Sequence, residues 1–432
     1  MPTTAASQLH NLWNIGKLPV RGDFIHMPNH RFLLIKGLSH NFWANAHQTA
    51  EMLLAAELTG RIPVVHWGTE CQHNGVVYNS AFDMYFEPIS AYSMDDVSRP
   101  DYTYDPPTWR YDNLTIDDAG RFSRSYRNAG QIMDSVANVV VSDISIPVKH
   151  FLPWITTDHA EYGMSPDQIY RYLFRKYLHL KPDIGREIQE LYASRLNNAE
   201  PVMAVHLPGD LAVDIYPQIL QFHKLNNLAT MKMPNLPRRY GKIRRTDRFL
   251  VDETTHLHEI VRLLPANQIG DPYRLFHPEI RHMLGKNAIS KIFLSTDREE
   301  IVEQFAQLYG PMLVYNGYER IPKNDARNGE PSETHLNARR KGLDAVKDAY
   351  LAARCDFFVG YGGSHLSLAV SRLKDWPETN LKLMYWMLPK YYNFSYEMIK
   401  TGRYAPEEFD GKYRLFMKRA ANLLHRVKRA FQ

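Results

Sequence analysis

The order of apolar and polar positions predicts a βαβ unit early in the chain. Residues 32–35 form a short apolar run, and Gly37 begins a turn after it. Apolar positions at helical spacing over residues 45–58 predict a helix, which Gly60 ends. Residues 62–67 then have the apolar character of a second strand. This order predicts two parallel strands joined by a right-handed crossover.

The stretch after this unit has a different composition. It is rich in Tyr, Pro and Asp up to about residue 120, which predicts irregular structure. Helical spacing returns over residues 167–180 and 184–196. The polar residues 197–201 that follow are the predicted boundary between two domains.

The second half of the chain alternates between strand and helix patterns. Residues 202–205 suit a central parallel strand, which Pro208-Gly209 ends. Repeated βα units in both halves predict an α/β fold of two Rossmann-like, doubly wound domains that face each other across a cleft. The domains are assigned to residues 1–200 and 201–400, with a C-terminal segment at 401–432. Later strands are predicted within 290–297, 311–316 and 356–364, and helices within 277–284, 298–310, 341–355 and 365–373.

The composition is that of an ordinary globular enzyme. Of 432 residues, 44% are hydrophobic and 23% are charged, and the net charge is +5. The basic residues form no stripe with interleaved aromatics, so nucleic acid is not expected as a partner. Cys71 and Cys355 are too few for a disulfide framework and fit reduced thiols. No signal peptide and no bilayer-spanning run is predicted, which favours a cytoplasmic protein.

Candidate chemistry gathers where three strands of the second half end, because ligands bind at the carboxyl ends of parallel strands. The first of these tips carries His206 and Asp210. The second carries Thr296 and Asp297. For Asp297 two roles are open, a contact to a nucleotide or sugar and the capping of the helix that follows.

The third tip is a glycine-rich turn between a strand and a helix. Gly362 and Gly363 allow a ligand to approach the backbone, and Ser364 adds a hydroxyl. His365 and Ser367 follow at the start of a helix, where free amides attract anions. Two interpretations stay open at this point, a cradle for a diphosphate and a purely structural turn.

Three blocks of the chain together resemble one family, the fucosyltransferase superfamily. "KGLSHNFWANAHQTAEMLLAAELTGRIPVVHWG" is similar to the N-terminal glycine-rich loop, helix and strand of the rhizobial nodulation fucosyltransferases. "SKIFLSTDREEIVEQFAQLYG" resembles the family's strand that ends in Ala/Ser-Thr-Asp. "GLDAVKDAYLAARCDFFVGYGGSHLSLAVSRL" resembles a block in which a helical Asp precedes a strand and a Ser-containing turn. The superfamily also includes the α1,6-fucosyltransferases of N-glycan cores and the protein O-fucosyltransferases.

This resemblance implies a GT-B architecture, with the nucleotide sugar on the C-terminal domain and the acceptor toward the N-terminal one. It implies GDP-fucose as the usual donor substrate, with no cofactor and no metal ion. By position in the family's motifs, Asp348 would contact the guanine base and Ser364 the diphosphate, and His206 corresponds to a family histidine. The residues assigned to donor binding by resemblance and position are Thr296, Asp297, Asp348, Gly362, Gly363, Ser364, His365 and Ser367.

The chain departs from the family at the first tip. There the family has an arginine that neutralises the leaving diphosphate, and this chain has Leu207-Pro208-Gly209. Three explanations are open: another cation serves, the donor is not GDP-fucose, or the protein binds without turnover. Arg239 and Arg245 in the following loop and Arg340 before Asp348 are assigned to donor binding. Their neighbours Arg238, Arg244, Arg339 and Lys341 are further candidates.

The general base is not fixed by the motifs either. Where the family has an acidic residue, this chain has Tyr216. Asp210 and Asp214 are the nearest carboxylates and are assigned, with His206, as catalytic residues, and turn hydrogen bonding is the alternative for both carboxylates. His256 and His258 lack a third ligand at metal-binding spacing, so no metal site is predicted.

The sequence therefore favours an inverting, metal-independent glycosyltransferase in polysaccharide biosynthesis. Its partners would be a nucleotide-sugar donor and a glycan or lipid-linked glycan acceptor. The alternatives are a catalytically weak or inactive relative that binds a nucleotide or glycan, and a transferase with a non-fucose donor. Fold alone does not decide between them.

The C-terminal segment predicts a basic amphipathic helix. Phe416, Leu423, Val427 and Phe431 share one face, while residues 412–432 carry seven Lys or Arg side chains and no acid. Two uses are open for this helix: packing across the N-terminal domain, or peripheral contact with the anionic inner face of a membrane.

Vesicle binding distinguishes these two uses. If the helix lies on a membrane, the full chain will cosediment with anionic vesicles at low salt and be released at high salt. Removal of about the last twenty residues will then abolish this binding and leave donor affinity intact, because the basic face supplies the attraction. An absence of binding at low salt excludes the membrane role.

Overall fold

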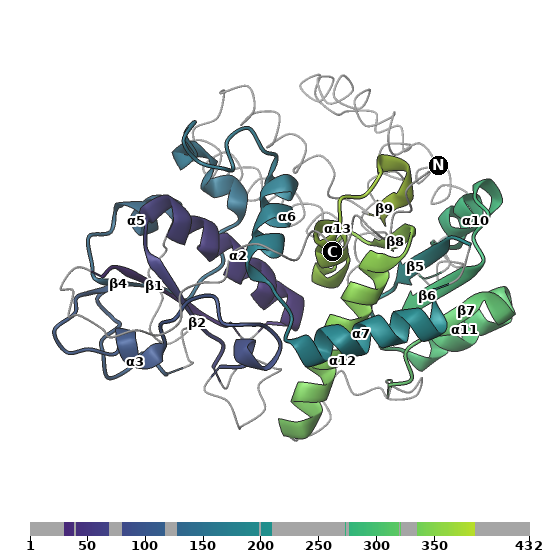
Figure 1. The fold of residues 1–432 in the computed structure, drawn as a ribbon, viewed down its shortest axis with the longest axis horizontal. Helices are drawn as coiled ribbons and strands as arrows, with labels where there is room; N and C mark the ends of the chain where they lie inside the picture. Colours follow the sequence, from purple (N-terminus) through teal and green to yellow (C-terminus); the bar gives the residue numbers. More distant parts are fainter. Residues whose placement is uncertain are drawn as a thin grey trace, which may run out of the picture.

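The computed structural model of the chain describes residues 30–38, 40–68, 80–116, 128–197, 200–209, 273, 276–318, 320 and 335–384. These residues form two parallel β-sheets, with helices packed on and between them (Figure 1). Several predicted features lie outside the described residues, namely Asp210, Asp214, Arg239, Arg245 and the segment 401–432.

The first sheet contains the predicted βαβ unit. Strand β1 (Phe32–Lys36) pairs in parallel with β2 (Ile62–His66), and α2 (Phe42–Thr59) connects them. The helix begins earlier than the apolar spacing indicates, because the Asn41 side chain accepts a hydrogen bond from the Ala44 amide and caps it. Gly60 ends the helix in the left-handed region, at a φ of 61°.

Two further strands complete this sheet in the order β2-β1-β4-β3. Strand β4 (Val139–Ser142) pairs with β1, and the two-residue β3 (Tyr104–Asp105) lies on the edge within the stretch predicted to be irregular. The other elements of this half are α3 (Met94–Val97), α5 (Ala129–Asp134), and the 3₁₀ turns η2 (Phe82–Met84), η3 (Val148–His150) and η4 (Leu152–Trp154).

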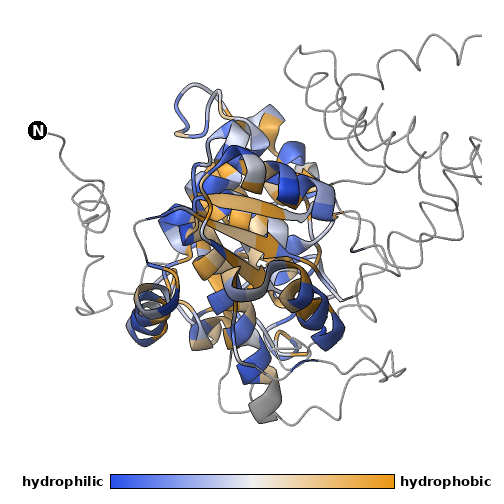
Figure 2. Ribbon diagram, turned by 90° about the vertical axis from the view of Figure 1, so that its right-hand side faces the viewer, coloured by the Kyte–Doolittle hydropathy of each residue, from blue (hydrophilic) through white to orange (hydrophobic). Residues whose placement is uncertain are grey.

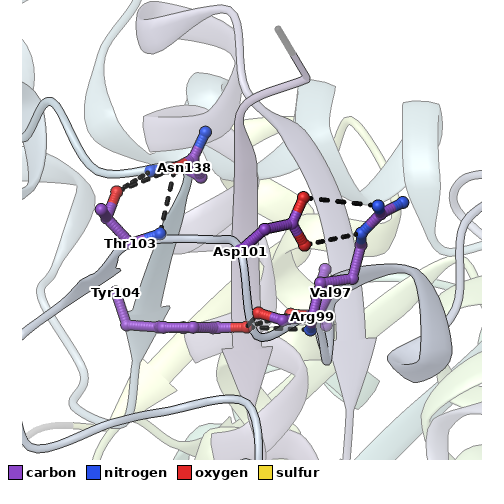
Figure 3. A network of polar contacts seen from close by, with 6 residues as sticks. All are labelled: Val97, Arg99, Asp101, Thr103, Tyr104 and Asn138. Carbon is purple, nitrogen blue, oxygen red and sulfur yellow. Dashed lines mark hydrogen bonds and ion pairs between the residues drawn. The ribbon is translucent and has the colours of Figure 1, made fainter. Parts of the chain in front are cut away.

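Side-chain hydrogen bonds hold the short edge strand in place (Figure 3). The backbone amide and hydroxyl of Thr103 both donate to Asn138 Oδ1, at 3.0 and 2.9 Å. The Tyr104 hydroxyl lies 2.8 Å from the carbonyls of Val97 and Arg99. A two-residue strand has few ladder bonds, so these contacts fix its register, and no local sequence pattern indicates them.

The second sheet has five parallel strands in the order β7-β6-β5-β8-β9. Numbered along the chain this is the order 3-2-1-4-5, which is the doubly wound arrangement of the Rossmann fold. The strands are β5 (Val202–His206), β6 (Lys291–Ser295), β7 (Leu313–Tyr315), β8 (Phe357–Tyr361) and β9 (Leu381–Met384). The predicted α/β class with two parallel sheets is confirmed, although the sequence did not indicate β9.

Helices cover the second sheet and turn their polar residues outward (Figure 2). In α11 (Glu299–Tyr309), Ile301, Val302 and Phe305 are buried at the helical spacing expected of one apolar face. The remaining elements are α10 (His277–Lys286), α12 (His335–Arg354), α13 (His365–Leu373), and the 3₁₀ turns η9 (Gly310–Met312) and η10 (Glu378–Asn380). In the described part of the chain, no helix is long and apolar enough to cross a membrane.

A shared core joins the two sheets. Helices α6 (Pro166–Tyr177) and α7 (Pro182–Arg195) connect them, and α2, α6, α12 and α13 pack together between them (Figure 1). One cluster of buried side chains includes Leu53 of α2, Leu173 of α6 and Val346 of α12. Trp43 Nε1 of α2 donates to the Ala345 carbonyl of α12 at 3.0 Å. The halves are therefore held together by apolar packing with polar contacts inside it.

Replacement of Trp43 tests this shared core. The side chain is 2% exposed, so Trp43→Ala should lower the free energy of unfolding by about 3–5 kcal/mol through loss of buried surface and a cavity. Trp43→Phe should cost less, since it loses mainly the hydrogen bond to Ala345. Chemical denaturation measures both. Val136, which is 93% exposed, is the control, and Val136→Ala should change the free energy by less than about 0.5 kcal/mol.

Candidate functional site

The centre of the second sheet is a topological switch point. Strands β5 and β8 are neighbours there. After β5 the chain continues to β6 and β7 on one side of the sheet centre, and after β8 it continues to β9 on the other side. His206 at the end of β5 lies in register with Ser295 of β6 and Gly360 of β8. The three predicted tips therefore come together along the edge of the sheet formed by the carboxyl ends of its strands, which is the position where doubly wound folds bind ligands.

His206 is buried at this edge and is neutral. Its Nδ1 lies 2.7 Å from Ser367 Oγ of α13, and the residue is 5% exposed. Burial lowers the pKa of His206 to about 3. A Cβ on Gly360 would lie 2.6 Å from Ser367 Oγ, so the glycine leaves room for this contact. His206 cannot supply the positive charge that the family's arginine provides.

The glycine-rich turn opens helix α13. The Gly362 amide donates to the Met384 carbonyl of β9 at 2.9 Å, and the Ser364 amide donates to the Tyr361 carbonyl at 3.0 Å. Ser364 is the N-cap residue, but its side chain makes no capping hydrogen bond. The first-turn amides of α13 and the Ser364 hydroxyl are thus the groups of this turn that face a ligand, since a helix start leaves its amides without intrahelical partners.

At the second tip, Thr296 is buried and Asp297 is exposed. The helix that follows has Arg298 as its N-cap residue, and the Arg298 side chain makes no capping hydrogen bond. A Cβ on Gly209 would lie 2.5 Å from Asp297 Oδ1 and 2.7 Å from Arg298 Cγ. The tips of β5 and β6 therefore touch at Gly209, where a larger residue would require the Asp297 and Arg298 side chains to move.

Asp348 lies beneath the β6 tip within a network of donors. Its Oδ1 accepts from Asn316 Nδ2 at 2.6 Å, and its Oδ2 accepts from Ser295 Oγ at 2.7 Å and from the Tyr318 hydroxyl at 2.5 Å. Burial raises the pKa of Asp348 to about 6, although the three hydrogen bonds oppose the shift. A nucleobase that pairs with the Asp348 carboxylate has to displace Tyr318 or Asn316 from it.

Arg320 is a cation at this edge that the sequence patterns did not indicate. Its guanidinium donates to the carbonyls of Thr296 and Asn316, at 3.2 and 2.6 Å, and lies over the rings of Tyr315 and Tyr318. No ion pair to it is found among the described residues. It was missed because it follows β7 in a short polar stretch without periodicity.

The other cations near the edge are exposed or already paired. Arg339, Arg340 and Lys341 lie exposed in the first half of α12, about two turns before Asp348. Arg298 pairs with Glu300, with 2.8 Å between Nη2 and Oε1. At the corresponding edge of the first sheet, Lys36 is buried and donates to the Ile116 carbonyl at 2.7 Å, over the Trp109 ring. Lys36 therefore holds the segment from Trp109 to Ile116 against the first sheet.

Within the described ranges, no group of three or more His, Cys, Asp or Glu side chains is arranged to hold a metal ion. Cys355 is a free, buried thiol whose pKa is raised by burial, so it is not a reactive nucleophile. The groups at this edge that suit an anionic ligand are the first-turn amides of α13, the Ser364 hydroxyl and the Arg320 guanidinium.

No protein-family model matches the chain, and no curated protein matches its sequence. Among solved structures, NodZ alpha-1,6-fucosyltransferase soaked with GDP-fucose aligns over 80% of this chain and 93% of its own, with 16% identity and a TM-score of 0.41. Fucosyltransferase NodZ from Bradyrhizobium aligns over 79% of this chain and 92% of its own, with 16% identity and a TM-score of 0.41. POFUT1 in complex with GDP-fucose aligns over 83% of this chain and 98% of its own, with 11% identity and a TM-score of 0.42. A variant of Arabidopsis thaliana FUT1 in complex with GDP aligns over 85% of this chain and 73% of its own, with 12% identity and a TM-score of 0.40.

These structures carry the names of the superfamily that the three sequence blocks resemble. At 11–16% identity and TM-scores of 0.40–0.42, the likeness transfers no residue role and no chemistry to this chain. The candidate site therefore rests on the motifs, on the sheet order and on the contacts at its edge.

The neutrality of His206 predicts a dependence of stability on pH. The unfolded side chain takes up a proton near pH 6.5 and the folded one only near pH 3, so stability is fully present above pH 6.5 and is lost as pH falls toward 3. At pH 4.5 this loss should amount to about 3 kcal/mol. His206→Gln should reduce the fall in the free energy of unfolding between pH 7 and 4.5, as measured by urea denaturation. The surface variant His282→Gln is the control and should retain the wild-type slope, and an unchanged slope in His206→Gln would contradict the assignment.

Proposed function

We propose that the chain is an inverting, metal-independent glycosyltransferase that moves fucose or a related deoxysugar from a nucleotide-sugar donor to a glycan. The observation that carries the proposal is the glycine-rich turn and helix start at the switch point of a 3-2-1-4-5 sheet. Two of the three family-like blocks contribute the β6 and β8 tips of the candidate edge, and the three blocks together support GDP-fucose as the donor.

The diphosphate of the donor would lie against the start of α13. Free first-turn amides and the positive end of a nine-residue helix favour an anion, and the Ser364 hydroxyl adds a donor. The base would extend toward the β6 tip, where Asp348, Tyr318 and Arg320 lie together. This direction follows from the register of β8, β5 and β6, which places their ends side by side.

The charge of the leaving diphosphate has to be met by a cation other than one on β5. Arg320 is held by carbonyls that include that of Thr296 at the β6 tip, and Arg340 lies exposed on α12, about two turns before Asp348. Guanidinium groups keep their charge in partly buried sites, where an imidazole such as His206 loses it. Arg239 and Arg245 stay candidates from the sequence.

A second function is favoured by one observation, the absence of a cation from the β5 tip itself. A relative with this tip could bind a nucleotide or glycan without transferring a sugar. Calorimetry with GDP, GDP-fucose, UDP and dTDP, followed by an assay for GDP-fucose hydrolysis, separates the two functions. Binding with turnover supports the transferase, and nucleotide binding without turnover supports the binding protein. No binding of any nucleotide contradicts the transferase and leaves glycan binding as the only form of the second function.

Ser364 provides a test of the diphosphate site. Ser364→Ala should weaken GDP binding about tenfold, because a hydrogen bond to a charged group contributes about 1.5 kcal/mol. Ser371, which lies two turns further along α13 and donates to the Leu368 carbonyl, is a matched control. Ser371→Ala should leave GDP affinity unchanged in calorimetry, and equal effects of the two variants would place the diphosphate elsewhere.

Asp348 provides a test of base selectivity. If its carboxylate pairs with guanine, Asp348→Asn should weaken GDP binding more than tenfold and UDP binding much less, since an amide cannot accept both guanine donors. Tyr318→Phe removes a competing donor from the same carboxylate and should leave GDP affinity at least as high as in the wild type. An equal loss for GDP and UDP in Asp348→Asn would show that the residue only supports the β6 tip.

A further inference from the structure

Helix α2 brings a buried histidine to the start of α13. His47, on the second turn of α2, is 4% exposed, and its ring lies 5.7 Å from the ring of His365, centroid to centroid. His365 is the first residue of α13 and is exposed at the glycine-rich turn. A side chain of the first domain thus reaches the place where the proposed donor diphosphate would bind.

Most polar side chains on this buried stretch of α2 have protein partners. Asn45 donates to the Leu38 carbonyl at 3.0 Å, Gln48 donates to the Lys36 carbonyl at 2.9 Å, and Glu51 accepts from Tyr170 and Ser145. These contacts compensate for burial of polar groups in a helix that is covered on all sides.

His47 is partnered on one nitrogen only. Its Nδ1 lies 2.5 Å from the Trp43 carbonyl, so Nδ1 carries the proton and donates it, and Nε2 is left as an acceptor. Nε2 is buried and has no hydrogen-bond partner among the described residues. A buried acceptor without a donor is costly, so a donor is expected from a neighbouring group that can turn toward it.

The ring of His365 is that neighbour. The remaining rings around His47 are Tyr170, whose hydroxyl is already donated to Glu51, and Phe174, which has no polar atom. Because the two ring centroids lie 5.7 Å apart, a rotation of the exposed His365 side chain can bring one of its N–H groups to His47 Nε2. Its other nitrogen then carries a free lone pair.

We propose that His365 is the general base of the transfer reaction, held in one tautomer by a hydrogen bond to His47. In the reaction the acceptor hydroxyl oxygen bonds to the anomeric carbon, and the bond from that carbon to the diphosphate oxygen breaks with its electron pair on the nucleoside diphosphate. The hydroxyl proton passes to the free nitrogen of His365 and is later lost to solvent. His365 is the catalytic residue and His47 is a positioning residue, the relation in which a base is oriented by a third group.

The charges around the pair keep both rings neutral before reaction. Burial and then the nearby Arg372 lower the pKa of His365, to which His40 also contributes, and burial and Arg372 lower that of His47. Arg372 of α13 is itself paired with Asp167 of α6, at 3.1 Å, and lies over the Tyr170 ring. A neutral imidazole at physiological pH is the form that accepts a proton.

The inference rests on the proposed function, and its test separates the two. GDP-fucose hydrolysis by the full chain is the probe, with water as the acceptor. Failure of the wild type to bind or hydrolyse GDP-fucose contradicts the proposed function, and this inference with it. A wild type that hydrolyses GDP-fucose while His365→Ala does so within threefold of the same rate contradicts this inference alone.

The expected result is a loss of rate without a loss of donor binding. His365→Ala should lower kcat about 100-fold or more, as removal of a general base does, and leave GDP affinity within about threefold. Added imidazole should restore part of the rate. His282→Gln is the control, because it changes an exposed histidine of α10 that takes no part in the proposed site, and it should hydrolyse GDP-fucose like the wild type. A parallel loss of GDP affinity and rate, without imidazole rescue, would assign His365 to donor binding and overturn the proposal.

The role of His47 has its own readout. In His47→Leu, kcat should fall about tenfold with an unchanged KM, and the acidic limb of the kcat profile against pH should move. The ¹⁵N chemical shifts of the His365 ring, measured on histidine-labelled full chain, should report one tautomer in the wild type and a mixture in His47→Leu. His47→Gln, which keeps an acceptor at this position, should retain more activity. Identical His365 tautomers in wild type and His47→Leu would overturn the positioning role.

Discussion

The packing of α2 against α6, α12 and α13 is the constraint on which the rest of the structure depends. This helix has apolar partners on all sides, so the turns from Phe42 to Ala56 are buried even where the sequence places Asn, Gln, His and Glu. The cost of burying those groups is offset only in this assembly, through contacts such as Tyr170 to Glu51 and Asn45 to the Leu38 carbonyl. The two sheets therefore share one core, and the candidate site lies at its polar margin.

Burial in these apolar surroundings also decides which side chains of the site carry a charge. Burial keeps His206 and His47 neutral and raises the pKa of Asp348 toward neutrality, so none of them brings a fixed charge of the kind that arginine does. Arginine resists this effect because its charge is delocalised and its pKa is high. The cations that persist at the edge are accordingly guanidinium groups, such as Arg320 between its tyrosines and Arg372 beside Asp167.

The parts of this arrangement that local pattern encodes were predictable. The periodicity of residues 341–355 and 365–373 indicated α12 and α13, and the glycine turn between β8 and α13 indicated the candidate diphosphate site. Strands β3, β4 and β9 were missed because two- and four-residue strands owe their pairing to neighbours far along the chain. The Asp348 network was missed for the same reason, since it unites Ser295, Asn316 and Tyr318 from different segments. Partners of this kind become visible only when the fold brings them together.

The β5 tip lacks the arginine of the family, and the structure adds a steric factor at this tip that the sequence could not reveal. A methyl group on Gly209 would overlap the side chains of Asp297 and Arg298, which follow β6. A longer side chain at this point therefore requires both of them to shift. The Arg298 guanidinium is held by Glu300 at 2.8 Å, so its charge is already matched. A cation can serve a leaving diphosphate at this edge only by giving up such a partner or by reaching it from further away. Arg320, held by carbonyls rather than by a carboxylate, loses less by doing so than Arg298 does.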